Sequence, residues 1–504
     1  MAALPKRSTP LAGPILLLIG LAAIALAAAA AQARFSTSPD VSWLITFSEK
    51  ILDGRRPYVD VIELNPPASI LLYLGPTAVA RLIGLWPEFA VAAFGFASVA
   101  ASLTLLGSML SRLQAGEASR NKIVLIAAAI LALLPARVFD QRDHLALVFG
   151  LPFFALLALK AEGRRTPLFI ALAAGIGAGL MICVRPHLAL AMIGPVLVAF
   201  RRRGWRAAAS PELAAAGGVA CLYGVAVVAL FPAFLENVLP MTAAVYVPAR
   251  EPLVALLASP GVIAWIVLAL VALWAKGDAF TASFGWASVG ALASYFIQGK
   301  GWPYHAYPAI ALAAMAAATA WRERAGAVRL QAAPVAAALG LSFLWMADGV
   351  GRSPELEAAL RRIGPHPSLL EISGDIALGH PLAREVGARW AQSVCSLWVA
   401  ADVDRQLRDF PVDPLRRQTL EAYRSEDLRR LIGDIRGNRP DAILTTAASA
   451  SLAQQVLSEV TDVVRYRAFA EAKGPHGAVT VLIRDDLAGA AVSGGPEFGQ
   501  ATSR

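Results

Sequence analysis

Charged residues are scarce in this chain. Asp, Glu, Lys and Arg make up 16% of its 504 residues, whereas hydrophobic residues make up 57%. Soluble domains contain about 25% charged and roughly 45–50% apolar residues, so this composition excludes an ordinary soluble protein. Long apolar runs fill residues 11–347. Because about 20 apolar residues can cross a bilayer as a helix, the sequence predicts a polytopic membrane protein.

The sequence also has little cysteine and none of the common nucleotide or metal motifs. Its three cysteines, Cys183, Cys221 and Cys395, are too scattered for a disulfide framework or a zinc–thiolate site. It contains no Walker loop, dinucleotide fingerprint or H-E-x-x-H pair. The net charge of +9 does not indicate a nucleic-acid partner, because the basic residues form short clusters between apolar runs, as membrane orientation requires. We therefore predict no metal site and no nucleic-acid binding.

The C-terminal part of the sequence has a different composition. Arg, Asp, Glu and Pro are frequent after residue 347, and no apolar run there is long enough to cross a membrane. The segments SLLEIS, PDAILTT and AVTVLIRD are typical of short strands, between helical stretches at 378–392, 414–436 and 449–459. We therefore predict an all-α membrane domain, a soluble α/β domain and a disordered Gly- and Ser-rich tail, at 1–347, 348–486 and 487–504.

The basic clusters predict how the chain crosses the membrane. If they all face the cytoplasm, an even number of crossings must separate the N-terminal cluster from the one around Arg112. The runs near 12–33 and 87–110 supply two crossings, so the segment 67–85 between them should not cross. A Pro-Pro pair precedes this segment and a Gly-Pro pair interrupts it. We expect an interfacial helix or hairpin on the outer face of the membrane.

Eleven crossings follow from this scheme. The first run is a retained signal anchor, since its apolar core is too long for a signal peptide. The N-terminus then lies in the cytoplasm, and the C-terminal domain lies in the periplasm outside a bacterial inner membrane. The predicted spans are 12–33, 87–110, 123–139, 145–159, 167–184, 188–200, 211–231, 258–275, 279–297, 306–321 and 330–347.

The predicted outer loops contain nearly all the polar residues that are unusual for a membrane domain. Ionisable groups at membrane depth are costly and usually functional. Cations combined with aromatic rings suit a lipid phosphate that carries a sugar, since the cations bind the phosphate and the rings stack on the sugar. The candidates, loop by loop, are Asp40, Asp60, Glu63 and Asn65; Asp140, Arg142, Asp143 and His144; Arg185 and His187; and Lys300, Trp302, Tyr304 and His305.

Each group of candidates also has a purely structural interpretation. Asp40 can belong to the start of a helix, VSWLITFSEKIL, that lies along the membrane surface. Asp60 and Glu63 can belong to a solvated loop. Arg142 can form a structural ion pair with one of the acids beside it. The Arg185 side chain can extend to the membrane–water interface, and Trp302 and Tyr304 fit an aromatic belt at that interface. The sequence leaves these alternatives open.

The stretch PDVSWLITFSEKILDGRRPYVDVIELNPPASILLYL resembles the first outer loop of the GT-C glycosyltransferases, which use polyprenyl-phosphate sugars. The matching residues are an acid soon after the first span, a Gly-x-x-Pro-Tyr-x-Asp pattern, a further acid and the Pro-Pro pair, at Asp40, Gly54, Pro57-Tyr58, Asp60, Glu63 and Pro66-Pro67. The chain is most similar to the branch of protein O-mannosyltransferases and aminoarabinose transferases. The resemblance covers roughly residues 10–345, and an Asp-Glu dyad after the first span is replaced here by Asp40-Val41.

This resemblance implies an inverting transferase with a lipid-borne donor and an acceptor in the cell envelope, which we expect to be a glycan, lipid or protein. Asp40 is our candidate for the general base. Asp60, Glu63 and Asn65 are expected to orient the sugar, and Asp143 or Asp140 matches an acid in the family's second outer loop. Arg185, Lys300 and His305, with Arg142 and His187, would neutralise the leaving phosphate. Some relatives use a divalent cation, Mg²⁺ or Mn²⁺, but no residues here fix one.

Three other functions fit a polytopic membrane protein. A lipid-linked-glycan transporter or flippase predicts internal repeats and charges near the membrane midplane, neither of which this sequence has. An O-antigen-type polymerase or ligase usually has its long outer loop late in the membrane domain, whereas here the long loop is the first. A non-catalytic assembly subunit would need the acids only for structure.

Overall fold

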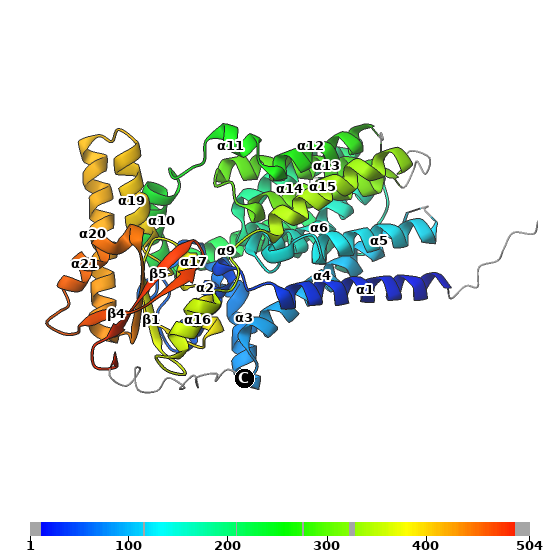
Figure 1. The fold of residues 1–504 in the computed structure, drawn as a ribbon. Helices are drawn as coiled ribbons and strands as arrows, with labels where there is room; N and C mark the ends of the chain where they lie inside the picture. The colour runs from blue at the N-terminus through cyan, green and yellow to red at the C-terminus, as the bar shows by residue number, and fades with distance from the viewer. Residues whose placement is uncertain (1–11, 114–115, 208, 275–276, 322–327, 489–504) are drawn as a thin grey trace, which may run out of the picture. The chain divides into compact units, whose positions relative to one another are not determined.

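The computed structural model describes residues 12–113, 116–207, 209–274, 277–321 and 328–488 (Figure 1). Most of the predicted tail, 489–504, therefore lies outside the described residues. The chain forms two compact units. Unit 1 comprises residues 1–35, 67–230 and 250–349, and unit 2 comprises 36–66, 231–249 and 350–504. Unit 2 thus includes two segments, 36–66 and 231–249, that the sequence assigned to loops of the membrane domain.

Unit 1 is a helical bundle, and a helix lies within each predicted span. Among the described residues, five helices are long and apolar enough to cross a membrane, namely α1, α4, α6, α9 and α13. The predicted polytopic all-α architecture is confirmed. The helices are α1 (Ala12–Arg34), α3 (Pro67–Ile83), α4 (Pro87–Leu110), α5 (Glu117–Ala132), α6 (Arg142–Ala161), α7 (Leu168–Val184), α8 (Leu190–Arg203), α9 (Pro211–Leu230), α11 (Leu253–Leu257), α12 (Pro260–Trp274), α13 (Ala279–Gln298), α14 (Pro303–Trp321) and α15 (Val328–Ala347).

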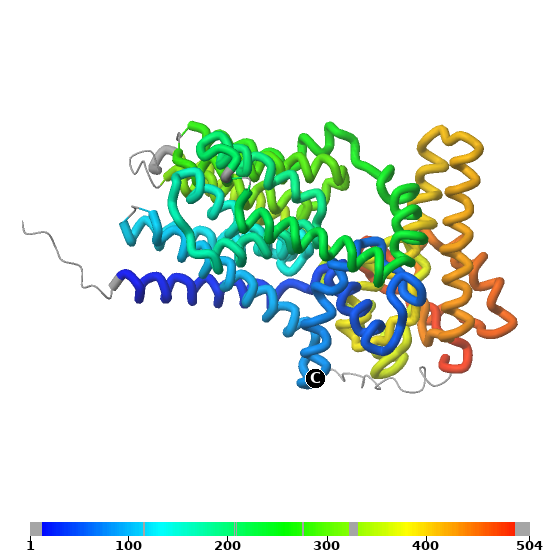
Figure 2. Tube along the Cα trace, turned by 180° about the vertical axis from the view of Figure 1, so that it is seen from behind, coloured from blue at the N-terminus to red at the C-terminus, as the bar shows by residue number. Residues whose placement is uncertain are grey.

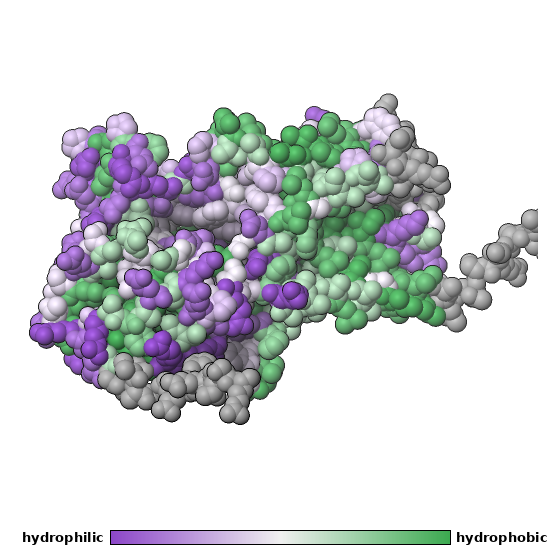
Figure 3. Space-filling view, viewed as in Figure 1, coloured by the Kyte–Doolittle hydropathy of each residue, from purple (hydrophilic) through white to green (hydrophobic). Residues whose placement is uncertain are grey.

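The bundle is built around α6 and α14. Both helices are apolar on all sides, and almost every described side chain in them is buried by neighbouring helices. In contrast, α9 buries only Glu212, Ala216 and Val227. The helices of unit 1 accordingly present a largely hydrophobic surface (Figure 3). This distribution is that of a bundle whose outer helices face lipid and whose inner helices face protein.

Helix α3 has a different direction from the rest of the bundle. It crosses the direction of α1 instead of running alongside it (Figure 1). Pro76 lies inside the helix, and Leu82 and Ile83 at its end are 84% and 59% exposed. An apolar helix with this direction and exposure fits an element that lies in the membrane interface. That this segment does not cross the membrane stays a prediction.

Unit 2 is an α/β structure with a five-stranded sheet of order β2-β1-β3-β5-β4. Strands β2, β1 and β3 are parallel, whereas β5 is antiparallel to β3 and β4. The predicted α/β domain is confirmed. Its strands are β1 (Ser368–Ile372), β2 (Arg389–Trp390), β3 (Ala442–Thr446), β4 (Tyr466–Gly474) and β5 (Gly477–Arg484), and its helices are α2 (Pro39–Leu52), α10 (Leu239–Met241), α16 (Pro354–Arg361), α17 (Ile376–Gly379), α18 (Leu382–Glu385), α19 (Trp398–Asp409), α20 (Pro414–Asn438) and α21 (Ala450–Ser458).

Helices cover both faces of this sheet. Leu370, Ile372 and Ile443 point to one face and pack against α20 and α21. Side chains alternate along a strand, so Leu369 and Glu371 point to the opposite face, where α17 packs on β1. Figures 1 and 2 show α19 and α20 side by side as an antiparallel pair. Figure 3 shows hydrophilic side chains over this pair, as expected for a soluble unit.

One predicted element of unit 2 is wrong. The sequence indicated a single helix at 378–392, but the structure has the two short helices α17 and α18, followed by β2. Pro381 lies between the two helices, where it cannot donate the backbone hydrogen bond that a continuous helix needs. The helices predicted at 414–436 and 449–459 correspond to α20 and α21.

Candidate functional site

Three segments of unit 1 bring ionisable side chains together around Asp143. This residue lies in the first turn of α6 and is fully buried. Its carboxylate forms an ion pair with the guanidinium of Arg185, which directly follows α7. The Nε2 atom of His187 lies 4.0 Å from Oδ1 of Asp143. The start of α6 and the segment that follows α7 therefore meet at one acid.

His305, in the first turn of α14, extends this group. It interacts electrostatically with Asp143, Arg185, His187 and Arg142. Its ring centroid lies 4.4 Å from that of Tyr304 and 5.3 Å from that of Trp302. The guanidinium carbon of Arg185 lies 6.0 Å from the Tyr304 centroid. We call Arg142, Asp143, Arg185, His187, Trp302, Tyr304 and His305 the bundle cluster.

Lys300 precedes the cluster's aromatic residues in a tightly folded loop. Gly299 and Gly301, on either side of it, have φ values of 65° and 70°, a conformation that favours glycine. A Cβ atom on Gly299 would lie 2.5 Å from Nε of Arg250. Arg250 in turn donates hydrogen bonds from Nη2 to the carbonyls of Phe296 (2.9 Å) and Ile297 at the end of α13. Arg250 therefore holds the loop that carries the buried Lys300 against the end of α13.

His144 and Asp140 lie beside Asp143 in sequence, but their contacts stabilise the turn before α6. The backbone N–H of Asp140 donates to Nδ1 of His144 (3.1 Å), and Nε2 of His144 lies 2.8 Å from the carbonyl oxygen of Leu131. Both ring nitrogens therefore hold the turn before α6 and none is left for a ligand. Asp140 has a φ of 62°, and its carboxylate packs on Gly95, where a Cβ atom would lie 1.8 Å from Oδ1. Burial raises the pKa of the Asp140 carboxyl well above its usual range.

Glu63 and Asn65 lie in unit 2, where they fold the first outer loop onto α2. One Glu63 oxygen accepts a hydrogen bond from Nε1 of Trp43 (2.5 Å), and the other accepts from the backbone N–H (2.9 Å) and the side-chain amide of Asn65. The Tyr58 hydroxyl donates to the carbonyl of Asn65 (2.8 Å). Both carboxylate oxygens of Glu63 are therefore occupied by donors of its own loop and helix.

Asp60 forms a hydrogen-bonded ion pair with Arg56. Its carboxylate accepts two side-chain hydrogen bonds from Arg56, at 2.8 and 3.0 Å, and one from the Arg56 backbone at 2.8 Å. These bonds lower the pKa of Asp60 to about 2. The pair closes a turn on the surface of unit 2.

Asp40 is the second residue of α2, after Ser38 at the N-cap and Pro39. A carboxylate in the first turn of a helix is stabilised by the helix dipole. Asp40 is half-buried and, like Glu63 and Glu371, interacts electrostatically with the buried thiol of Cys395. Asp40 and Glu63 thus share surroundings in unit 2, whereas Asp60 is occupied by Arg56.

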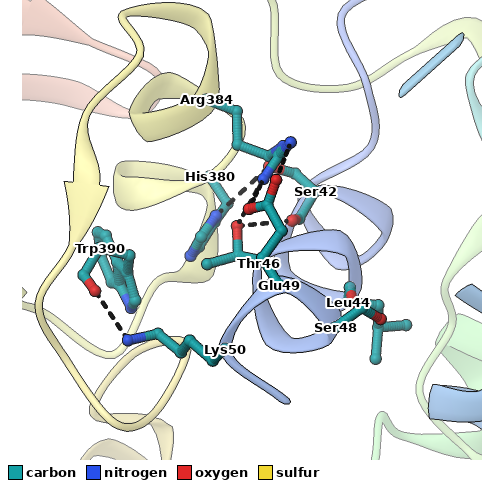
Figure 4. Close-up of polar contacts among 9 residues, drawn as sticks. All are labelled: Ser42, Leu44, Thr46, Ser48, Glu49, Lys50, His380, Arg384 and Trp390. Atoms are coloured by element: carbon teal, nitrogen blue, oxygen red, sulfur yellow. Dashed lines mark hydrogen bonds and ion pairs between the residues drawn. The ribbon is translucent and has the colours of Figure 1, made fainter. Parts of the chain in front are cut away.

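The C-terminal part of unit 2 holds α2 through side-chain bonds that sequence reasoning did not find (Figure 4). Arg384 donates from Nη1 and Nη2 to the two carboxylate oxygens of Glu49, at 2.5 and 3.1 Å, across 335 positions of sequence. Nζ of Lys50 donates to the carbonyl of Trp390 (2.8 Å), and the Ser42 hydroxyl lies 3.4 Å from Nδ1 of His380. Burial lowers the pKa of His380 to about 3 and that of Lys50 to about 8.

These bonds change the interpretation of α2. The apolar spacing predicted a helix on the membrane surface, but every residue from Val41 to Ser48 is buried within the structure. The apolar side chains that suggested lipid contact instead pack inside unit 2, because α17 lies against α2. No pattern in the sequence could have linked α2 to residues more than 300 positions away.

A metal site has little support in the part of the chain that the structure describes. No group of three or more His, Cys, Asp and Glu residues among those residues is arranged to hold a metal ion. The bundle cluster instead combines one acid with guanidinium and imidazole groups, a set suited to an anion.

The fold is similar to that of a solved membrane enzyme. The crystal structure of ArnT from Cupriavidus metallidurans bound to undecaprenyl phosphate matches 95% of this chain and 99% of its own length, with a TM-score of 0.56 and 13% sequence identity. This likeness shows that the chain has a GT-C-like fold, as the first-loop motif predicted. No family model and no curated protein matches the sequence.

Proposed function

We propose that this protein is an inverting glycosyltransferase that moves a sugar from a polyprenyl-phosphate donor to an acceptor in the cell envelope. Two observations support this function. The chain has the fold of ArnT, whose solved structure holds undecaprenyl phosphate. The bundle cluster, which carries the proposal, gathers basic and aromatic side chains from three separate segments at the ends of membrane helices.

The bundle cluster would bind the donor's phosphate. Arg185 can present a planar pair of N–H donors to phosphate oxygens, a geometry that lysine does not offer. His187 and His305 lie beside it, and the rings of Tyr304 and Trp302 offer flat apolar faces to the sugar or the first isoprene units. Asp143 then acts as a positioning residue, because its carboxylate fixes the guanidinium of Arg185.

The reaction that we propose breaks the bond between the anomeric carbon and the phosphate oxygen. The acceptor hydroxyl attacks the anomeric carbon from the opposite face, so its configuration inverts. Asp40 takes the proton of that hydroxyl as general base. The cations of the cluster stabilise the negative charge that develops on the leaving phosphate.

The remaining candidates receive different roles. Glu63 and Asn65 would act indirectly, by holding α2 and hence Asp40 through Trp43. Lys300 would add a further positive charge from its glycine-flanked loop. We assign no catalytic role to Asp60 and no substrate-binding role to His144, because Arg56 binds the Asp60 carboxylate and backbone groups bind both ring nitrogens of His144.

The first test is whether the bundle cluster binds the lipid phosphate. We expect the purified protein in nanodiscs to bind undecaprenyl phosphate, and Arg185→Gln to weaken that binding at least tenfold. Arg137→Gln is the matched control, since Arg137 is another arginine of unit 1 and donates instead to the Ala347 carbonyl (2.8 Å). Equal binding by the Arg185→Gln variant and the native protein would remove the cluster from the donor site.

The second test concerns the reaction itself. We expect deletion of the protein to remove one sugar from an envelope glycan, and expression of the Asp40→Asn variant not to restore it. Asp53→Asn, at the other end of α2, is the control and should restore it fully. Mass analysis of envelope glycans checks both outcomes, and identical glycan profiles with and without the protein would contradict a transferase.

A further inference from the structure

The parallel part of the unit 2 sheet contains a point at which the chain changes direction. After β1 the chain proceeds to β2 on one side, whereas after β3 it proceeds to β4 and β5 on the other. The loops that leave the carboxyl ends of β1 and β3 therefore diverge. In open α/β sheets, ligands bind in the crevice that opens at such a point.

A cavity of about 420 Å³ lies at this position in unit 2. Its walls come from the loop after β1, from the loop after β3 with the start of α21, and from α19 and α20. The lining residues used below are Gly374, Asp404, Arg408, Arg424, Ser451 and Gln455. We call this cavity the switch pocket.

The loop after β1 is held close to α19, which shapes one wall of the switch pocket. A Cβ atom on Gly374 would lie 2.4 Å from the Cβ atom of Ala401, so only glycine permits this approach. The carbonyl of Gly374 accepts a hydrogen bond from the Ser396 hydroxyl (3.3 Å). The wall is therefore fixed by packing and hydrogen bonding.

The charged groups of the switch pocket are partly occupied. Nε of Arg408 donates to Asp409 (2.9 Å), and its guanidinium forms no other hydrogen bond with the described residues. A guanidinium has five N–H donors, so most of those on Arg408 can reach a ligand. Arg424 binds Asp404 through Nε (2.7 Å) and Nη2 (3.3 Å), which leaves further lone pairs on the Asp404 carboxylate as acceptors.

The pocket therefore combines donors, acceptors and one available positive charge. Asp404 can accept hydroxyl protons, and the exposed Ser451 and Gln455 on α21 can both donate and accept. Arg408 can bind a phosphate or carboxylate, and the α21 N-terminus adds positive potential on the same side. A hydroxyl-rich ligand with one anionic group satisfies all of these groups at once.

We propose that the switch pocket binds a sugar that carries one acidic group, either a phosphate or a carboxylate. The site lies entirely within unit 2 and does not include any residue of the bundle cluster. It goes beyond the proposed transferase function, because binding in this pocket does not depend on transfer. In a transferase it would hold part of an acidic acceptor or product.

The test uses the full-length protein in detergent micelles and four probes: glucose 6-phosphate, glucuronate, glucose and inorganic phosphate. Isothermal titration calorimetry gives the affinity for each probe. We expect at least one acidic sugar to bind tenfold or more tightly than both glucose and inorganic phosphate. Preference between the phosphate and the carboxylate sugar identifies the anionic group. Equal affinity for glucose, or no binding of either acidic sugar, would overturn the proposal.

Variants locate the binding at the switch pocket. Ser451→Trp places a large side chain in the pocket from an exposed position of α21 and should abolish binding. Arg408→Ala should lower the affinity for the acidic sugar at least tenfold and leave the weak affinity for glucose unchanged. Arg417→Ala, on α20 outside the pocket, is the control, and thermal unfolding verifies that each variant is folded. Unchanged binding by the first two variants would place the ligand elsewhere and refute the site.

Discussion

Asp143 in unit 1 and two acids of unit 2, Glu371 and Asp427, are buried in different ways. In the bundle cluster of unit 1, the acid Asp143 is neutralised by a cation, Arg185, with imidazoles beside it. In unit 2 the buried acid Glu357 is paired with Arg352, whereas Glu371 and Asp427 are buried without an ion pair among the described residues. Burial raises the pKa of Glu371 well above its usual range and that of Asp427 to about 7.

This difference separates a charged site from a neutral core. A buried cation that stays charged needs an anion close to it, and a ligand phosphate can share that role. A buried carboxyl that takes up a proton needs only a hydrogen-bond partner, and at neutral pH it contributes no strong field. This contrast supports our proposal that the bundle cluster binds an anion. In unit 2, the contribution of Asp427 to stability should depend on pH.

The largest expected effect comes from breaking the Asp143–Arg185 pair. Arg185→Ala leaves the Asp143 carboxylate buried without its cation, which should reduce the free energy of unfolding by about 3–5 kcal/mol. The double variant Asp143→Leu/Arg185→Met should recover most of that stability, because two apolar side chains replace the pair. It should still fail to bind undecaprenyl phosphate. Thermal unfolding and lipid titration of the three proteins measure both effects.

Recovery of binding in the double variant would contradict this interpretation of unit 1. It would mean that the pair serves the fold and that the phosphate binds elsewhere.

The second prediction concerns pH and unit 2. The folded-state pKa of Asp427 is about 7, against an ordinary value of 3.8. Because the folded pKa is the higher one, the stabilisation is fully present below about pH 4 and is lost as the pH rises through about 7. Burial raises this pKa despite the hydrogen bond that the carboxyl accepts from the backbone N–H of Ala400 (3.0 Å). The shift corresponds to a loss of about 4 kcal/mol.

Asp427→Asn provides the comparison for this prediction. The asparagine keeps a carbonyl acceptor for Ala400 but does not titrate, so its free energy of unfolding should fall less between pH 4 and 8. Urea unfolding at several pH values measures the difference between the two proteins. Parallel pH profiles would show that Asp427 is already ionised in the folded protein at low pH.

Most of the helical architecture could be predicted from the sequence, because apolar runs are long in a membrane protein. The position of a helix at 67–83 could also be predicted, whereas the prediction that it does not cross the membrane rests on the basic residues and stays a prediction. The membrane orientation predicted from the basic clusters placed the segments that carry Asp143, Arg185 and His305 at one surface. The structure brings these three side chains together.

Other features depend on contacts that no local pattern encodes. Asp143 and His144 are neighbours in sequence, yet Asp143 forms an ion pair with Arg185, whereas His144 binds the carbonyl of Leu131. Successive residues of a helix point in different directions, and the surrounding helices decide what each one meets. The burial of α2 was missed for a similar reason, since Arg384 and His380 reach it from the far end of the chain.

A third prediction asks whether Glu63 supports the loop or takes part in catalysis. Glu63→Ala removes the acceptor for Trp43 and Asn65, which should cost about 1.5–3 kcal/mol because these bonds involve a charged group. Glu63→Gln keeps one oxygen acceptor and should cost less. Urea unfolding followed by tryptophan fluorescence measures both. A Glu63→Gln variant of native stability that no longer transfers sugar would assign Glu63 to the chemistry.

The smallest effect is expected for the Glu49–Arg384 pair, which completes the comparison because it is an ion pair in unit 2. The Glu49 side chain is 38% exposed and that of Arg384 is 11% exposed, so water screens the pair and its coupling energy should be about 1 kcal/mol or less. A double-mutant cycle with Glu49→Gln and Arg384→Gln isolates that coupling. Raising the salt concentration should weaken it, whereas the buried Asp143–Arg185 pair should respond little. If both pairs responded equally to salt, water would reach Asp143 as readily as Glu49, and the bundle cluster would lose the low-dielectric setting on which its phosphate binding depends.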